Sequence, residues 1–173
     1  APPDRPPAGE AGYILFVGRL SPEKGVDILL RAAARPHARN AAPPVVIAGD
    51  GPARPGLERL ARELGLGDAV RFTAQVAPAG LPALYAGAML CAFPSLWAEN
   101  CPMAALEALS YGVPGVAADT GGLPEIIRDG DTGRVVPRGD HAALAAAIAG
   151  LIAAPERRAA LGRHARAVYE REY

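Results

Sequence analysis

Short, continuous apolar runs alternate along the chain with longer stretches in which apolar residues recur every three or four positions. Runs that are apolar throughout are typical of strands buried on both faces of a parallel sheet. The predicted strands are YILFVG (13–18), VVIAG (45–49), VRFTA (70–74), MLCAFPS (89–95), GVAA (115–118) and RVV (134–136). The predicted helices cover residues 26–35, 57–64, 81–86, 103–110, 123–128, 142–152 and about 156–169.

This regular alternation predicts the fold class. Consecutive β-α units with right-handed crossovers build an α/β domain with a doubly wound, Rossmann-like parallel sheet flanked by helices. Residues 1–12 are proline-rich and lack periodicity, so we interpret them as a linker or an artificial end of the chain. Residues 13–173 form one domain of ordinary size. Ligands of such sheets bind beyond the carboxyl ends of the strands, so the loops after the strands are the candidate site.

Composition narrows the possible functions. The 18 Lys and Arg residues balance 18 Asp and Glu residues, which argues against an extended nucleic-acid-binding surface. No apolar run approaches the roughly 20 residues of a membrane-spanning helix, and no secretory pattern opens the chain. The two cysteines, Cys91 and Cys101, and three histidines form neither a disulfide framework nor a zinc set. We therefore expect a cytoplasmic protein without a metal site.

A glycine and two basic residues mark the loop after the first predicted strand, GRLSPEKG (18–25). Gly18 permits a tight turn, and Arg19 and Lys24 lie beside the start of a helix. An arginine fork matches phosphate oxygens bidentately and a lysine supplies a point charge, so with helix N–H groups they would form an anion site. The alternative is that both are solvated surface cations, as most arginines and lysines are.

The loops after the second and third strands are weaker candidates. Gly49 and Gly51 lie in GDGP (49–52), which is neither the dinucleotide motif GxGxxG nor a P-loop. The alternative interpretation is a plain turn with Pro52 at the first helical position. In AQVAP (74–78), Val76 and its neighbours would offer backbone groups to a nucleotide base.

Residues 93–125 hold the densest set of candidate groups. Glu99 lies in a loop after a strand, and Glu107 follows after seven intervening residues, on a helix that starts near Pro102. Proline costs little at this point, because its missing N–H would have no intrahelical partner. The N–H groups of Met103 and Ala104 remain free for an anion or a sugar hydroxyl.

Each of these groups also has a structural interpretation. Glu107 is flanked by alanine and leucine, and a carboxylate in such company usually has a partner. That partner is either a ribose diol or a group within an ordinary amphipathic helix. Gly121 and Gly122 permit close backbone approach to a ligand. Glu125 falls in the first turn of the next helix, where a negative charge also stabilises the helix dipole.

Together these loops resemble the C-terminal, donor-binding half of retaining GT-B glycosyltransferases of family 4, also called glycosyl transferases group 1. The resemblance covers nearly all of residues 13–169 and is carried by GRLSPEKG, AGDGP, PSLWAENCPMAALEALSYGVP and DTGGLPE. It implies an enzyme of carbohydrate biosynthesis that transfers a hexose from a nucleoside-diphosphate sugar to an acceptor. The resemblance further implies retention of the anomeric configuration and no requirement for a cofactor or metal.

The resemblance also assigns roles to residues. Arg19 and Lys24 would hold the donor diphosphate and stabilise the leaving group, and Glu99 would meet hydroxyls of the transferred sugar. Glu107 would hold the ribose hydroxyls. The phosphate and sugar cradle would be completed by backbone N–H groups of Cys101, Met103, Ala104, Gly121 and Gly122.

The sequence departs from the common pattern of the family at four positions. Cys101-Pro102 replaces a frequent Phe-Gly pair, and Pro102 donates no hydrogen bond, so one frequent backbone contact is lost. Ala74 stands where glycine is usual, and Met89 where aspartate is common. Neither of these last two changes removes a residue assigned to chemistry.

Enzymes of this family have two Rossmann-like domains, and the N-terminal one binds most of the acceptor. We therefore expect the chain to be the donor half alone, as a truncated fragment or half of a split enzyme, with little activity by itself. In many members the full-length enzyme works at the inner face of the membrane. The alternatives are a nucleotide-sugar epimerase of GT-B architecture, a non-catalytic nucleotide-sugar-binding domain, or a glycoside hydrolase that uses Glu99 and Glu107.

Overall fold

The structure of the chain, a computed structural model, describes residues 12–37 and 43–173. The segment 1–12, predicted to be a linker, lies outside this part except for Gly12, so its role stays a prediction.

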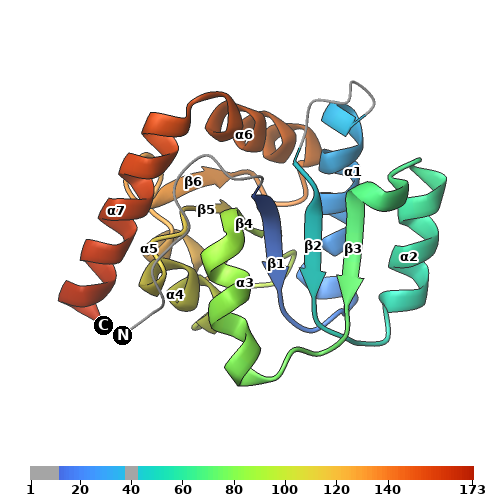
Figure 1. Cartoon of the computed structure of the whole chain (residues 1–173), viewed down its shortest axis with the longest axis horizontal. Helices are drawn as coiled ribbons and strands as arrows, with labels where there is room; N and C mark the ends of the chain where they lie inside the picture. Colours follow the sequence, from blue (N-terminus) through green and yellow to red (C-terminus); the bar gives the residue numbers. More distant parts are fainter. Residues whose placement is uncertain (1–11, 38–42) are drawn as a thin grey trace.

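Six strands form one sheet in the order β3-β2-β1-β4-β5-β6 (Figure 1). Every neighbouring pair is parallel, as the predicted doubly wound fold requires. The strand order changes direction between β1 and β4, because the chain runs outward from β1 to β3 on one side and from β4 to β6 on the other. The strands are β1 (Tyr13–Val17), β2 (Val45–Ala48), β3 (Val70–Thr73), β4 (Ala88–Phe93), β5 (Gly115–Ala118) and β6 (Gly133–Val136).

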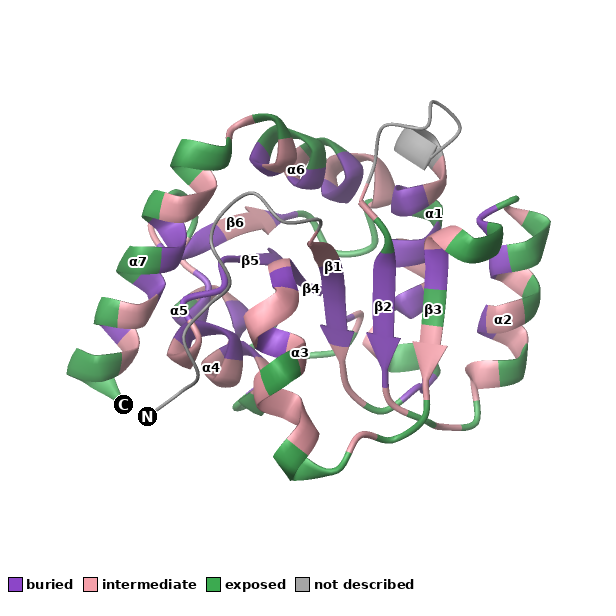
Figure 2. Ribbon diagram, in the orientation of Figure 1, coloured by how far each residue is buried: buried purple, intermediate pink, exposed green. Residues whose placement is uncertain are grey.

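Helices cover both faces of the sheet, so the central strands are buried on each side (Figure 2). Successive side chains of a strand point to opposite faces. Ile14 and Phe16 of β1 therefore pack into one core with α1, α2 and α6, while Leu15 packs into a second core with α3, α4, α5 and the end of α7. The α-helices are α1 (Val26–His37), α2 (Arg54–Glu63), α3 (Leu81–Gly87), α4 (Met103–Ser110), α5 (Leu123–Ile126), α6 (His141–Ala153) and α7 (Pro155–Glu172), and the short 3-10 helices are η1 (Pro22–Lys24), η2 (Gly67–Ala69) and η3 (Pro78–Gly80).

The helix boundaries follow the sequence pattern most closely at α4. This helix spans the predicted residues, and Pro102 precedes it as the N-cap residue in extended geometry. The placement of Pro52 at a first helical position is wrong, because α2 begins at Arg54 and Pro52 lies in the preceding turn. That turn is held by the N–H of Ala53, which donates to the carbonyl of Leu20 at 2.9 Å.

The loops that follow β1 and β4 lie against each other where the strand order changes direction. The N–H of Leu96 donates to the carbonyl of Glu23 at 2.8 Å. Gly25 has φ +65°, and a Cβ atom there would stand 2.1 Å from the carbonyl oxygen of Pro94, so no other residue fits. Crevices at such positions are the usual ligand sites of open α/β sheets.

Candidate functional site

A pocket of about 490 Å³ lies at the carboxyl ends of β1, β2 and β3. We call it the strand-end pocket. The loops after these three strands, which the sequence singled out separately, meet in it. Of the predicted site residues, Gly18, Arg19, Gly49 and Val76 line it. The rest of its lining comes from Val17, Ala48, Asp50, Gln75 and Leu81.

Glycines hold the loops around this pocket close together. A Cβ atom on Gly49 would stand 1.9 Å from the carbonyl oxygen of Gly18, and one on Gly51 would stand 2.3 Å from that of Leu20. The N–H of Leu20 also donates to the carbonyl of Asp50 at 2.9 Å. Gly51 therefore contacts the neighbouring loop and does not line the pocket, so its small size serves loop packing.

Lys24 and Glu99, the two residues predicted to act on opposite ends of a sugar phosphate, contact each other. Lys24 Nζ lies 2.8 Å from Glu99 Oε2, and the hydroxyl of buried Ser95 donates to Glu99 Oε1. The Lys24 and Glu99 side chains are 28% and 22% exposed, so water screens their attraction only in part. The sequence did not reveal this contact, in which the Lys24 ammonium group has a carboxylate partner.

The ion pair joins the loop after β1 to residues 94–102, which we call the glutamate loop. Lys24 and Glu99 are 75 positions apart in the sequence, so their spacing did not indicate that they form an ion pair. Ser95, whose hydroxyl fixes the second carboxylate oxygen, was also missed by the sequence reasoning. Lys24 is the only lysine in the chain.

Arg19 is the second predicted cation, and it differs from Lys24 in its surroundings. Its side chain is exposed at the rim of the strand-end pocket. Within the described residues it has no hydrogen-bond or ion-pair partner. The Ser21 hydroxyl, more than the nearby Arg19 and Lys24 charges, holds the pKa of the Glu23 carboxyl below its usual value. Arg19 thus retains its full donor capacity for an anion.

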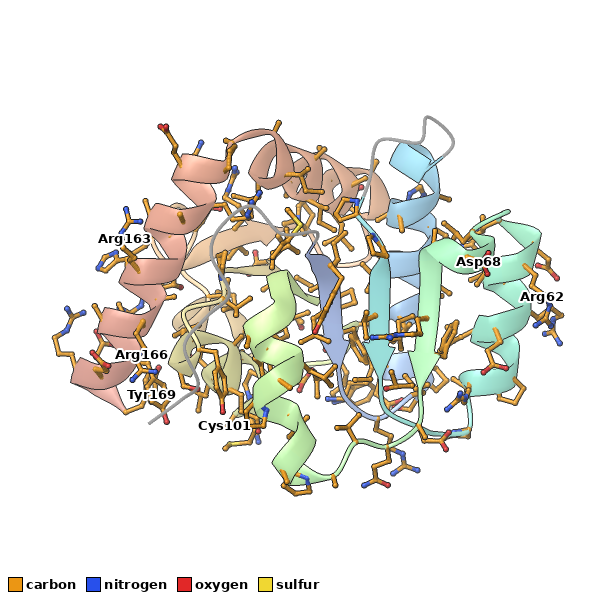
Figure 3. The ribbon with its side chains drawn as sticks, in the orientation of Figure 1. Arg62, Asp68, Cys101, Arg163, Arg166 and Tyr169 are labelled. Atoms are coloured by element: carbon orange, nitrogen blue, oxygen red, sulfur yellow. The ribbon has the colours of Figure 1, made fainter. Side chains whose placement is uncertain are left out.

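The N-terminus of α4 presents the backbone donors that the sequence predicted. The first intrahelical acceptor is the Pro102 carbonyl, which takes the N–H of Ala105 at 2.9 Å. In the part of the chain that the structure describes, the N–H groups of Met103 and Ala104 have no acceptor. Cys101 precedes them and is exposed, in the lower left part of the view in Figure 3. Free N–H groups at a helix N-terminus attract anions.

Glu107 lies one turn into α4 and has a partner that the sequence did not reveal. The hydroxyl of Tyr85, in α3, donates to Glu107 Oε2 at 2.8 Å. The sequence predicted that this carboxylate has a partner, and the chain itself supplies one in Tyr85. A tyrosine in an otherwise apolar helix was the only available signal, and helix packing decided which carboxylate it reaches.

Gly121 and Gly122 approach the chain's own backbone. A Cβ atom on Gly121, whose φ is +55°, would stand 2.5 Å from the nitrogen of Glu99. The N–H of Gly122 donates to the carbonyl of Glu99 at 2.7 Å. The expectation that the Gly122 N–H binds a ligand therefore needs correction, whereas that for the Gly121 N–H stays a prediction. Both glycines hold the glutamate loop, and the Gly122 N–H is already occupied.

Among the described residues, no three His, Cys, Asp or Glu side chains are grouped closely enough to hold a metal ion. In the same part of the chain, none of the helices combines the length and the apolar character that a membrane crossing demands. Independence from metals stays a prediction.

Two curated relatives are similar over most of the chain. D-inositol 3-phosphate glycosyltransferase 2 of Catenulispora acidiphila is 41% identical over 165 residues, which are 90% of this chain and 38% of that protein. The GDP-mannose-dependent alpha-(1-6)-phosphatidylinositol monomannoside mannosyltransferase of Mycolicibacterium smegmatis is 38% identical over 162 residues, 89% of this chain and 42% of that protein. The chain thus spans about two fifths of the length of these relatives.

The structure of HepE from Anabaena in complex with UDP-glucose superposes with a TM-score of 0.85 at 27% identity, over 96% of this chain and 46% of that one. The fold predicted from the sequence is confirmed by this likeness. The family model described as "Glycosyl transferases group 1" matches residues 2–168. With nearly its whole length matched, the chain belongs to the glycosyl transferases group 1 family.

Proposed function

We propose that the chain is the donor-binding part of a retaining glycosyltransferase that moves a hexose from a nucleoside-diphosphate sugar to an acceptor. The observation that carries the proposal is the joint position of three features at one edge of the sheet. These are the strand-end pocket, the two cations Arg19 and Lys24, and the free N–H groups that open α4. HepE, which has the same fold, is seen with UDP-glucose, and two relatives are named as glycosyltransferases.

The proposed binding mode follows from the chemistry of these groups. The apolar and backbone surfaces around Val76 and Leu81 would receive the nucleoside, and Glu107 the ribose hydroxyls. Arg19, Lys24 and the α4 N–H groups would hold the diphosphate. Fixed cations and helix dipoles stabilise the charge that develops when a nucleoside diphosphate leaves, and this is the main catalytic requirement of the transfer.

The ion pair adds one step to this scheme. For Lys24 to reach a phosphate oxygen, its ammonium group must leave or share Glu99 Oε2. Glu99, once released, would accept hydrogen bonds from hydroxyls of the transferred sugar, with one oxygen still fixed by Ser95. The diphosphate would thus take the place of Glu99 at Lys24, and the sugar would take the place of Lys24 at Glu99.

Transfer itself and the choice of acceptor concern the whole protein. Because the chain spans about two fifths of its relatives, we propose that acceptor binding needs a further domain and that the chain alone turns over little or no donor. We also propose that the reaction needs neither metal nor cofactor and takes place in the cytoplasm, at the inner face of the membrane.

Isothermal titration of the chain with UDP, GDP and ADP tests donor binding. We expect at least one of them to bind with a dissociation constant below about 1 mM, which corresponds to roughly 4 kcal/mol. Arg62→Ala is the control, because this exposed arginine of α2 lies away from the strand-end pocket (Figure 3). If none of the three nucleotides binds at millimolar concentration, the proposal is wrong.

The reaction type is tested on the full-length protein. Proton NMR of the product should show the anomeric configuration of the donor, and EDTA should leave the rate unchanged. An inverted product would exclude retention, and loss of activity in EDTA would exclude metal independence. Formation of an epimerised nucleotide sugar, without transfer to the acceptor, would favour the epimerase alternative.

A further inference from the structure

Tyr85 is a buried polar residue that the proposed binding mode does not yet use. It lies in α3, is 1% exposed, and its ring stacks on that of Tyr111 with centroids 5.3 Å apart and planes 4° from parallel. Its hydroxyl reaches Glu107 Oε2 at 2.8 Å. Packing on all sides therefore fixes the ring, and the ring fixes the position of the hydroxyl.

The direction of this hydrogen bond follows from burial. Burial, more than the neighbouring Glu107 charge, raises the pKa of the Tyr85 phenol, so the hydroxyl stays protonated and donates. A second acceptor, the Ala104 carbonyl, lies farther away at 3.4 Å. A bond to a carboxylate is stronger than one to a neutral carbonyl, so the proton belongs on the Glu107 side.

One oxygen of Glu107 is thus held and the other is available. Across the described residues, Glu107 Oε1 has no hydrogen-bond partner, whereas Oε2 is bound to Tyr85. A carboxylate held through one oxygen keeps a fixed orientation for the acceptor sites that remain. Preorganisation of this kind strengthens a second hydrogen bond, because less side-chain freedom is lost when the bond forms.

The helix that carries Tyr85 also borders the strand-end pocket. Leu81, at the start of α3, lines the pocket, and Tyr85 follows it by four residues. Residues at this spacing lie on the same face of a helix. The same face of α3 therefore contacts the pocket at one end and Glu107 of α4 at the other.

We propose that Tyr85 is a positioning residue that sets the specificity of the site for ribose. By holding Glu107 Oε2, it aims Oε1 at the vicinal hydroxyls of a ribonucleotide bound in the strand-end pocket. The inference rests on the proposed function, since it requires nucleotide binding. It goes further, because it assigns the preference for ribose over dideoxyribose in part to Tyr85, a residue that does not contact the ligand itself.

The test compares a nucleoside diphosphate with its 2′,3′-dideoxy analogue by isothermal titration. UDP serves as the probe, or whichever nucleotide the chain binds best. The native chain should prefer the ribonucleotide. In Tyr85→Phe this preference should fall by about fivefold, the value of one hydrogen bond of about 1 kcal/mol. Affinity for the dideoxy analogue should stay unchanged, because that ligand offers Glu107 no hydroxyl.

Tyr13→Phe is the matched control. The Tyr13 hydroxyl donates to the Leu84 carbonyl at 2.7 Å, so this variant also loses a bond to α3 but none to Glu107. Its ribose preference should equal that of the native chain. In Glu107→Ala, which leaves the Tyr85 hydroxyl no side chain to position, adding Tyr85→Phe should have no further effect on the preference. Circular dichroism checks that the variants fold. The Tyr85→Phe variant should fold, because a phenylalanine ring can keep the stack on Tyr111.

Each outcome decides something. A preference that is unchanged in Tyr85→Phe, or lowered equally in Tyr13→Phe, overturns the role of Tyr85 and leaves the proposed function standing. A native chain that binds the ribo and dideoxy ligands equally well overturns the role of Glu107 and with it that of Tyr85. If no nucleotide binds the native chain at all, the proposed function itself is wrong.

Discussion

The strand-end pocket and the glutamate loop belong to the same edge of the sheet, but their polar groups are organised in different ways. Around the pocket, loops are joined backbone to backbone by contacts such as Gly49 with Gly18, and the Arg19 side chain stays exposed. In the glutamate loop the functional side chain itself is engaged, because Glu99 accepts from Lys24 and Ser95.

This difference separates two ways of preparing a binding site. A ligand in the strand-end pocket fills space that the loops already enclose, so its binding requires little rearrangement. A ligand at Glu99 must exchange with an existing ion pair, and only the difference between the new and old contacts contributes to affinity. We therefore expect binding of the nucleoside and binding of the sugar phosphate to respond differently to mutation.

The largest effect should come from forcing the glutamate loop away from its support. In Gly121→Ala the new Cβ would collide with the Glu99 backbone at a φ of +55°, so the free energy of unfolding should fall by about 2–4 kcal/mol. Urea unfolding measures it. Gly130→Ala is the control, since Gly130 has φ +76° but no atom within 4 Å of an added Cβ, and should lose only about 1 kcal/mol. Equal losses would mean that the loop yields to the collision.

Lys24→Ala should give the next largest effect. It removes a proposed phosphate ligand and leaves Glu99 without its counter-charge, so nucleoside diphosphate binding should weaken by about 1.5–3 kcal/mol. Binding of the matching nucleoside, which has no phosphate, should not change. Titration calorimetry with both ligands measures the two values. A similar loss for both ligands would contradict the division between pocket and loop.

Arg19→Ala should weaken diphosphate binding less, by about 1 kcal/mol. Arg19 is exposed and has no carboxylate partner within the described residues, so its removal uncovers no buried charge. The same calorimetric series supplies the measurement. Should Arg19→Ala cost as much as Lys24→Ala, the Glu99 carboxylate adds nothing to the effect at Lys24.

The smallest effect should have the opposite sign. In Glu99→Gln the lysine no longer has a charged partner to leave, so affinity for a nucleoside diphosphate without sugar should rise by about 0.5–1 kcal/mol. Glu63→Gln is the control, because it breaks an exposed pair with Arg59, on the surface of α2. Unchanged or weaker binding in Glu99→Gln would show that the ion pair does not compete with phosphate.

The order of strands and helices was predictable because each strand is a continuous apolar run between helical stretches. The start of α4 was also predictable, since Pro102 cannot continue a helix towards its N-terminus without losing a hydrogen bond. The start of α2 was missed by three residues. Polar residues such as Arg54 and Glu58, which pair along the helix, do not contribute to an apolar pattern.

The residue types of the site were predictable, but the partners of these residues were not. Glu99 and Glu107 stood out in the sequence, whereas Lys24, Ser95 and Tyr85 as their partners depend on packing between distant elements. The sequence singled out Gly121 and Gly122 because glycine permits close approach of the backbone to a ligand. Only the structure shows that Gly121 and Gly122 approach the glutamate loop.

Because Lys24 is the only lysine, this site can be labelled selectively. Every other basic side chain among the 18 Lys and Arg residues is a guanidinium, which amine-selective reagents such as succinimidyl esters leave untouched. Such a reagent therefore has one side-chain target, the 28% exposed Lys24. Acylation there would remove the positive charge and release Glu99 in one event. A nucleotide bound at the site should protect Lys24 from acylation, and mass spectrometry of the labelled chain would measure this protection.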